Sequence, residues 1–529
     1  MAGGTPEPPL ASPDRRRLLV VLGYGAVSAV AVGALGPPDR GRAADARNPT
    51  APEPALATEA AEPPSLAGAG PAPGADHRYD LVVSRARIID PESGFDAVAD
   101  VGIDGGTITA ISHQPLRAAG TTIDGHDRVL APGFIDVLSD APNDHGVANK
   151  LRDGVTTNLG MHGTGRSAGD HRTAFPDGTV PLHHGAAFDT PFERARLEVG
   201  AFEPATAAKL DRLVAEADRQ LSEGFIGIDV EPEYTPGTDF EELRRLGEVA
   251  ADHDLPLFFH GRYSDDDPPG TNADTLAEIL AVATETGVGV HVDHITSTGG
   301  TFSMERSLAT LERARADGLE VSACMYPYDF WATTIGSARF ADGWEERFRI
   351  SYDDLAITGT GERLTAASFD RYRSNEPDLL AAAFAIPEAD IRTALRSPLV
   401  MVASDAILEP GDRNHPRSSG CFARTLGHYV RDEGVLSLSE ALVKMTILPA
   451  QRFERGVPAF ARKGRLQRGA DADLVLFDPT TIADRATLTD PARPSTGVEG
   501  VVVSGRVVLG PDCLRSDVRP GRFLTAGAA

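Results

Sequence analysis

Three histidines and one aspartate follow apolar or β-branched runs, so each places a polar side chain where a strand gives way to a loop. Imidazole nitrogens bind Zn²⁺ at ~2.0–2.1 Å, and three of them leave a fourth position for water. A nearby carboxylate would take a proton from that water and return it to a leaving nitrogen. These residue types therefore predict a metal-dependent hydrolase, with His162, His260 and His294 as ligands and Asp405 as the catalytic residue.

The elements that must position these residues alternate between strands and helices. Apolar residues from Leu210 to Leu221 recur at helical spacing, and Gly224 ends that run. Strands that alternate with helices form a parallel sheet, and eight of them predict a (β/α)₈ TIM barrel over residues 131–455. Such a barrel carries its catalytic groups at the C-terminal strand ends. The candidate strands are Phe134–Val137, Thr156–Leu159, Thr179–His183, Phe225–Val230, Pro256–Phe259, Val288–Val292, Glu320–Cys324 and Leu399–Ala403.

The two ends of the ordered chain are rich in short strands instead. Within residues 78–130, Asp104-Gly105-Gly106 separates two apolar runs, which is typical of a hairpin. Within residues 456–529, Ser504-Gly505 separates two more. We therefore expect one small β-sandwich domain that is formed from both ends of the chain.

The connection between the seventh and eighth candidate strands, residues 329–398, is unusually long and contains both tryptophans, Trp331 and Trp344. A loop of this length is normally structured or functional. It could cover the substrate, or it could serve a structural or dimer-forming role.

The N-terminal residues predict export. Arg15-Arg16-Arg17 precedes the uncharged stretch from Leu18 to Leu35, and Ala44-Asp45-Ala46 offers a small-residue cleavage site. We interpret residues 1–46 as a twin-arginine-like signal that is read by the export machinery, and the protein as extracellular or located in the cell envelope. If the segment is not cleaved, it would act as a membrane anchor. Residues 47–77, rich in Pro and Ala, are expected to form a disordered linker.

The composition excludes some partners. The 529 residues include 77 acidic and 51 basic side chains, for a net charge of −26, which argues against nucleic acid or an anionic membrane as a partner. Cys324, Cys421 and Cys513 are isolated, so they indicate neither a disulfide framework nor a thiolate metal cluster.

Further short motifs run along the chain: Ala131-Pro132-Gly133-Phe134-Ile135-Asp136-Val137, Asp153-Gly154-Val155-Thr156-Thr157, Glu233-Tyr234-Thr235-Pro236-Gly237, His260-Gly261-Arg262, Tyr326-Pro327-Tyr328, Ser404-Asp405, His415-Pro416-Arg417 and Arg519-Pro520-Gly521-Arg522. Together they resemble the N-acyl-D-amino-acid deacylase (D-aminoacylase) family of the amidohydrolase superfamily. The resemblance covers nearly everything from Tyr79 to Leu524. It implies a barrel with a β-sandwich domain, a zinc ion, and hydrolysis of an N-acyl-D-amino acid to the free amino acid and a carboxylate.

The chain departs from the family pattern at two metal positions. Members of the family usually have His-x-His after the first strand, where this chain has Leu138-Ser139-Asp140. The cysteine ligand that usually follows the second strand is matched here by His162. We therefore expect one zinc ion in a three-histidine site, with Asp140 as a weak additional ligand.

The small-molecule substrate that the resemblance implies carries a carboxylate, for which arginine is a bidentate partner. Arg417 is the family-like candidate, with Tyr326 and Tyr328 as hydroxyl donors. Arg262 follows His260 by two residues and is either a further substrate contact or half of a structural ion pair. Two other residues at family positions, Glu233 and His184, are expected to pack or to support the ligands.

These observations predict zinc-dependent hydrolysis of a linear amide, most simply the deacylation of an N-acyl-D-amino acid. Two alternatives remain open at this point. One is an amidohydrolase that acts on another amide, such as a small peptide or a cyclic amide. The other is a secreted binding protein that has lost catalysis, since a missing His-x-His motif is also what decay of the site would leave.

Overall fold

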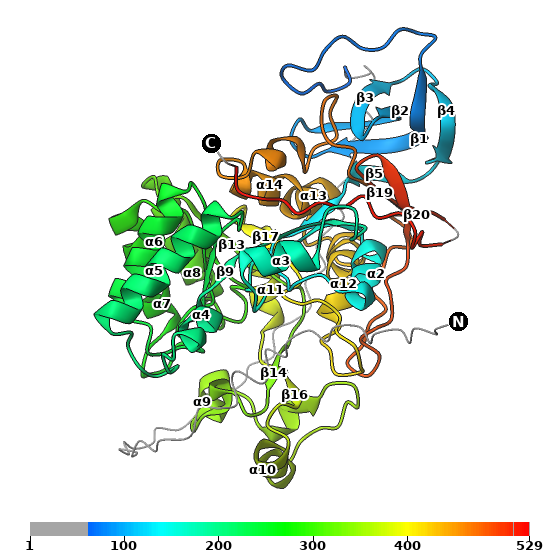
Figure 1. Ribbon diagram of the computed structural model, residues 1–529. Coiled ribbons are helices and arrows are strands. Elements are labelled where there is room, and N and C mark those ends of the chain that lie inside the picture. Colours follow the sequence, from blue (N-terminus) through cyan, green and yellow to red (C-terminus); the bar gives the residue numbers. More distant parts are fainter. Residues whose placement is uncertain (1–61, 512, 528–529) are drawn as a thin grey trace, which may run out of the picture.

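The computed structural model describes residues 62–511 and 513–527, which form a barrel, a small β-domain and an insertion (Figure 1). The predicted export signal, residues 1–46, lies outside these ranges. Of the expected linker, residues 62–77 are described, and there the expectation of disorder is wrong. Ser65 forms a β-bridge with Arg468, and the Leu66 N–H donates to the Arg468 carbonyl at 2.9 Å. The expectation rested on side-chain composition, whereas this contact is made by backbone groups, which can pair whatever side chains they carry.

The small β-domain is an eight-stranded sheet to which both ends of the chain contribute, as predicted. Its strands are β1 (Arg78–Asp90), β2 (Phe95–Asp104), β3 (Thr107–Ser112), β4 (Arg117–Asp124), β5 (Val129–Pro132), β18 (Leu474–Phe477), β19 (Val498–Val503) and β20 (Arg506–Leu509). They pair in the order β20-β19-β18-β5-β1-β2-β3, with β4 added beside β1. The antiparallel pairing of β18 with β5 joins the two ends.

Both predicted hairpins of this domain are confirmed. The turn residues Gly105 (φ 53°) and Gly106 (φ 90°) separate β2 from β3, and Ser504 (φ 48°) and Gly505 (φ 72°) separate β19 from β20. Two consecutive residues with positive φ make a type I′ turn, whose twist matches that of the flanking strands.

The barrel consists of parallel strands that are buried along their whole length. They are β6 (Phe134–Asp136), β7 (Val155–Gly160), β8 (His183–Ala186), β9 (Phe188–Asp189), β10 (Ile228–Val230), β11 (Leu257–Phe259), β12 (Val290–Val292), β13 (Val321–Met325) and β17 (Val400–Val402). β8 and β9 are two pieces of the third strand. The order β6-β7-β8 continues as β9-β10-β11-β12-β13-β17, and the Asp405 N–H closes the ring by donating to the Leu138 carbonyl at 2.8 Å.

The predicted third strand was misplaced. It was expected at Thr179–His183, but the strand begins at His183. The apolar residues Val180 and Leu182 are buried as expected, but they lie against the C-terminal segment, where the Gly521 N–H donates to the Val180 carbonyl at 2.9 Å. The apolar run therefore marked burial rather than a place in the barrel.

Helices surround the barrel, with α5 to α8 forming one side of the ring in Figure 1. The predicted helical spacing is confirmed in α5, which buries Leu210, Leu213, Ala217 and Leu221. The helices are α2 (Asp144–Arg152), α3 (Ala168–Ala174), α4 (Thr190–Arg196), α5 (Ala207–Ser222), α6 (Phe240–Asp252), α7 (Asn272–Thr286), α8 (Met304–Ala316), α11 (Glu388–Arg396), α12 (Arg417–Arg424), the π-helix η3 (Thr425–Asp432), α13 (Leu438–Met445), α14 (Ile447–Phe453) and the 3-10 helix η4 (Pro458–Arg462). In the part of the chain that the structure describes, no helix combines the length and apolar character needed to cross a membrane.

The connection between β13 and β17 forms a structured insertion, which projects from the barrel on the side opposite the β-domain (Figure 1). Its elements are β14 (Trp331–Thr334), the 3-10 helices η1 (Ala338–Phe340) and η2 (Tyr352–Asp354), α9 (Trp344–Phe348), β15 (Leu355–Ile357), α10 (Ala366–Asn375) and β16 (Leu380–Ala383). Both tryptophans are buried in its aromatic core, where Trp331 packs on Phe340 and Trp344 stacks on Phe369.

Candidate active site

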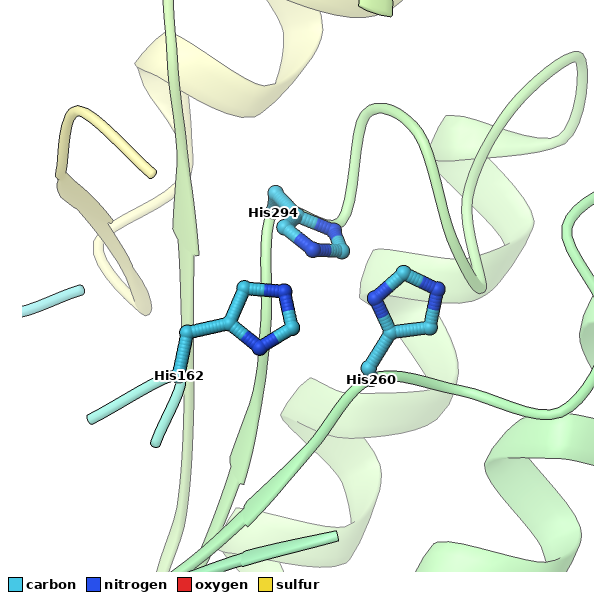
Figure 2. A group of neighbouring side chains, drawn as sticks. All are labelled: His162, His260 and His294. Carbon is cyan, nitrogen blue, oxygen red and sulfur yellow. The ribbon is translucent and has the colours of Figure 1, made fainter. Parts of the chain in front are cut away.

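The three predicted histidine ligands come together at the C-terminal end of the barrel. His162 follows β7, His260 follows β11 and His294 follows β12. Figure 2 shows the three imidazoles around a common space. Each ring has one nitrogen such that the three nitrogens all lie within 4.8 Å of one another. The closest two ring centroids, those of His260 and His294, are 4.7 Å apart.

The contacts of His260 select the nitrogen that it offers. Its Nε2 lies 2.7 Å from Oε2 of Glu233. Burial raises the pKa of Glu233, but Arg339 and the bond with His260 outweigh it and lower that pKa to about 2. The carboxylate is therefore ionised and can only accept, so Nε2 carries the proton. Nδ1 keeps its lone pair, and it is buried without a hydrogen-bond partner among the described residues.

The other two histidines are oriented in the same way, each through the nitrogen that faces away from the shared space. Nδ1 of His294 lies 3.1 Å from the Ser297 hydroxyl and 3.3 Å from the Thr298 hydroxyl. Nδ1 of His162 lies 2.8 Å from Oε1 of Glu231. The nitrogens left for a shared ion are therefore Nε2 of His162, Nδ1 of His260 and Nε2 of His294. Contacts of this kind fix ring orientation at metal sites.

The electrostatic environments of two of the rings differ. Burial, helped by the positive charges of neighbouring rings, lowers the pKa of His294 well below its ordinary value, so this imidazole is neutral, as a metal ligand must be. Burial also lowers the pKa of His162, but the carboxylates of Glu231 and Asp229 outweigh it and leave that pKa well above the ordinary value. A metal ion at His162 therefore competes with a proton.

Asp405, which follows β17, faces the same space. Its Oδ1 lies 3.8 Å from Nε2 of His162, and its Oδ2 lies 3.8 Å from Nε2 of His294. Burial raises the pKa of Asp405, and the nearby Arg417 offsets part of that rise. Asp405 (φ 50°) and His294 (φ 26°) both have left-handed backbone conformations, which cost non-glycine residues about 1–3 kcal/mol. The backbone is therefore strained at His294 and Asp405, which are two of the four residues predicted to carry out the chemistry.

Arg417, at the start of α12, forms an ion pair with Asp405, with 2.8 Å between its Nη2 and Oδ2 of the carboxylate. Its guanidinium lies over the Tyr326 ring, 4.2 Å from the ring centroid. The Tyr326 hydroxyl and Nε of Arg417 are both buried without a hydrogen-bond partner among the described residues. The structure thus brings Arg417 and Tyr326 to Asp405 and leaves two donors there for an acceptor.

The structure shows the surroundings of three other residues that were expected at the site. The Tyr328 N–H donates to the Tyr326 carbonyl at 3.0 Å, a tight turn that directs Tyr328 toward Arg424 and Asp484 instead of Asp405. The guanidinium of Arg262 binds Glu278 at 2.8 Å and the Thr238 carbonyl at 2.7 Å, which is the structural ion pair of the two alternatives.

Asp140 is the third. It is absent from the groups of candidate ligand atoms that lie within 4.8 Å of one another in the described chain. Its carboxylate acts on the site through charge, since it raises the pKa of both Asp405 and Arg417.

Comparison with known proteins decides the family. Residues 380–509 match the sequence profile of the Amidohydrolase family. An N-acyl-D-glutamate deacylase of Alcaligenes xylosoxydans xylosoxydans is 31% identical over 497 residues, which cover 85% of this chain and 98% of that protein. A D-aminoacylase of the same organism is 29% identical over 494 residues, which cover 85% and 98%. The chain belongs to the N-acyl-D-amino-acid deacylase family.

A solved structure supports the same assignment. The N-acyl-D-glutamate deacylase of Bordetella bronchiseptica, in complex with zinc and a phosphonate that mimics the tetrahedral intermediate, superposes with a TM-score of 0.73. It is 27% identical and covers 85% of this chain and 100% of its own. The predicted family, and with it the barrel with a small β-domain, are confirmed, and this family member is a metal-dependent amidohydrolase.

The donor set of this deacylase fits the metal that its family implies. Three imidazole nitrogens and one carboxylate are ligands that Zn²⁺ prefers, and the buried lone pair at Nδ1 of His260 lacks any other partner among the described residues. His162, which the family resemblance matches to a cysteine ligand, lies within the group.

Two residues near the site, Glu231 and Arg339, were not assigned from the sequence. Glu231 contacts His162, whereas Glu233, which contacts His260, has the supporting role that we expected. Arg339 comes from the insertion: it donates to the Ser297 carbonyl at 2.7 Å, lies 3.7 Å from Oε2 of Glu233 and stacks on Trp331. No sequence pattern marks Arg339, because its position depends on how the insertion folds back.

Proposed function

We propose that this chain hydrolyses the amide bond of an N-acyl-D-amino acid, using one zinc ion held by His162, His260 and His294. The observation that carries the proposal is the position of Asp405, whose carboxylate oxygens lie 3.8 Å from Nε2 of His162 and of His294. A proton acceptor thus stands beside the nitrogens that would hold the ion. Zinc, when bound, supplies Lewis acidity, which polarises the scissile carbonyl and makes the attacking water more acidic.

Asp405 acts as the general base and then as the general acid. Burial raises the pKa of this carboxyl above its ordinary value, which makes it a stronger proton acceptor. Its ion pair with Arg417 fixes the orientation of the carboxylate, with one oxygen toward each of His162 and His294.

Arg417 and Tyr326 bind the α-carboxylate of the substrate. Nε of Arg417 and the Tyr326 hydroxyl are buried donors without an acceptor among the described residues, and leaving such groups unpaired costs about 1–3 kcal/mol each. A substrate carboxylate would accept from both and would also meet the guanidinium charge.

Arg339 favours substrates that carry a second negative charge. Its Nε is buried without a partner among the described residues, and its guanidinium lies 3.7 Å from Glu233, which contacts the ligand His260. The Alcaligenes relative that is 31% identical is an N-acyl-D-glutamate deacylase, which agrees with an acidic side chain on the substrate.

Export through the twin-arginine-like signal is part of the proposal. It rests on the order of Arg15-Arg16-Arg17, the uncharged stretch from Leu18 to Leu35, and Ala44-Asp45-Ala46. Replacing Arg15, Arg16 and Arg17 by lysine should trap the protein inside the producing cell. Equal amounts of both proteins in the exported fraction would contradict this part.

A substrate screen tests the proposed reaction. The zinc-loaded protein should release the amino acid from N-acetyl-D-amino acids, most rapidly from N-acetyl-D-glutamate, and hardly at all from the L-isomers. Removal of zinc with a chelator should abolish turnover, and its addition should restore turnover. Turnover of small peptides or cyclic amides instead would favour another amidohydrolase activity, and no turnover of any amide would favour a binding protein.

A further inference from the structure

A second group of potential metal ligands lies on the other side of the His162 ring. Asp229 belongs to β10, and Glu231 follows that strand. One ligand atom from each of these two residues and one from His162 lie within 4.8 Å of one another. Nδ1 of His162 is 2.8 Å from Glu231 and 3.9 Å from Asp229. This nitrogen is the one not used by the three-histidine site.

Asp229 is a buried carboxylate without a hydrogen-bond donor. Its side chain is fully inaccessible, and neither Oδ1 nor Oδ2 has a hydrogen-bond partner among the described residues. The 3.9 Å to Nδ1 of His162 exceeds hydrogen-bond range. Asp293, after β12, is also fully buried with both oxygens unpartnered in the described chain. Burying carboxyl groups without a hydrogen-bond partner is unfavourable, and a bound cation would satisfy their oxygens.

The strand register explains why these acids lie together. Asp229 is paired with Phe258, and Phe258 with His291, so these residues lie on the same side of the sheet. Residues two positions further along the strands share that side, which includes Glu231, His260 and Asp293. The three acidic residues therefore face the barrel interior together with the metal ligand His260.

The arginines of the site are already engaged elsewhere. Arg417 is paired with Asp405 at 2.8 Å, and Arg339 lies 3.7 Å from Glu233. Among the described residues, no arginine or lysine nitrogen lies within 4.0 Å of an oxygen of Asp229 or Asp293.

The same barrel satisfies another buried acid completely. Asp136 in β6 is also fully inaccessible, but Lys150 lies 2.5 Å from its Oδ2, the Ser404 hydroxyl 2.6 Å from that oxygen, and the Ser404 N–H donates to its Oδ1 at 2.9 Å. Asp229 thus lacks the partners that another fully buried acid of the same barrel has. A zinc ion bound by the three histidine nitrogens would still leave both oxygens of Asp229 without a partner among the described residues.

We propose that Asp229, Glu231 and Nδ1 of His162 form a second divalent-cation site inside the barrel. The site shares His162 with the zinc site of the proposed function, through the opposite ring nitrogen. One imidazole and two carboxylates suit first-row divalent ions such as Zn²⁺ or Mn²⁺. When both nitrogens of His162 hold ions, the ring gives up its N–H proton to solvent, as metal binding to histidine requires.

Metal content of the zinc-reconstituted full-length protein tests this proposal. After removal of loosely bound metal, the protein should retain two equivalents of zinc. Asp229→Asn should retain one, His260→Ala should retain the other, and His162→Ala should retain neither. Asp478→Asn, a buried acid of the β-domain that accepts from Thr480, is the matched control and should retain two. Glu231→Gln, like Asp229→Asn, should retain one equivalent of zinc.

Unfolding provides a readout that does not depend on catalysis. In chelator, Asp229→Asn should unfold at a higher temperature than the original protein, because an amide costs less to bury than a carboxyl group that has no hydrogen-bond partner. Saturating zinc should raise the unfolding temperature of this variant less than it raises that of the original protein.

Suppose that the original protein binds one equivalent of zinc, that Asp229→Asn and Glu231→Gln keep it, and that His260→Ala loses it. This result would overturn the second site and leave the proposed function standing. One equivalent that survives in His260→Ala and is lost in Asp229→Asn would support the second site and remove the zinc site of the proposed function. No bound zinc would overturn both.

Discussion

Nε2 of His260 lies 2.7 Å from the Glu233 carboxylate, and this contact decides which nitrogen of His260 can hold a metal. Glu233→Gln should therefore weaken zinc binding, because a neutral amide orients the ring less firmly and no longer increases the electron density on the imidazole. Loss of such a contact typically costs about 10–100-fold in metal affinity. Competition with a chelator measures this loss.

The control for this prediction is Glu216→Gln, an acid on α5 that pairs with Arg219 away from the site. Equal zinc affinities for Glu233→Gln and the original protein would show that Glu233 does not support His260.

Arg339 should set the preference for acidic substrates. Arg339→Met should raise KM for N-acetyl-D-glutamate by roughly tenfold or more, since a hydrogen bond to a charged group contributes about 1.5–3 kcal/mol. KM for N-acetyl-D-leucine should change little. Steady-state kinetics with both substrates measures the difference. Arg371→Met, on α10 of the same insertion and more than half exposed, should leave both values unchanged. A parallel loss for both substrates would remove Arg339 as a selectivity residue.

The contact of Asp473 with Lys463 and His183 should make stability depend on pH. The carboxylate lies 2.6 Å from Nζ of Lys463 and 3.1 Å from Nε2 of His183. Burial raises the pKa of Asp473, but the two basic groups outweigh it and lower that pKa far below its ordinary value. The stabilisation is thus complete above the unfolded-state pKa of about 3.9 and is lost as pH falls from there through the folded-state pKa.

Asp473→Asn should therefore cost roughly 3 kcal/mol or more at pH 7, as breaking a buried pair does, and less at pH 3. Urea unfolding at the two pH values measures this difference. Asp96→Asn, which breaks an exposed pair with Arg87, should cost less than about 1 kcal/mol at either pH. A cost that is the same at pH 3 and pH 7 would contradict the charge argument.

The parts of the site that follow from barrel geometry could be predicted. His162, His260, His294 and Asp405 each follow a strand, and the C-terminal ends of parallel barrel strands converge. The spacing of apolar residues located these strands closely enough to bring the four residues together. The third strand was misplaced because the apolar residues Val180 and Leu182 pack on the C-terminal segment, which local spacing does not reveal.

The parts that depend on loops could not be predicted. Tyr328 turns away from Tyr326 because of one backbone hydrogen bond, although residues two apart on a strand would face the same way. The supporting role of Glu233 was expected, but its partner His260 was not, because Glu233 lies in the turn after β10, where the Tyr234 N–H donates to the Glu231 carbonyl. Arg339 depends on the fold of the whole insertion.

Turnover by Asp405→Asn, measured together with its zinc content, tests the central claim most directly. The asparagine preserves the shape of the side chain but cannot accept the proton of the attacking water. The variant should therefore keep its zinc and lose about 10²–10⁴-fold in kcat for N-acetyl-D-glutamate. Full zinc content with unchanged kcat would contradict the assignment of Asp405 as the proton acceptor, and with it the proposed reaction at the three-histidine site.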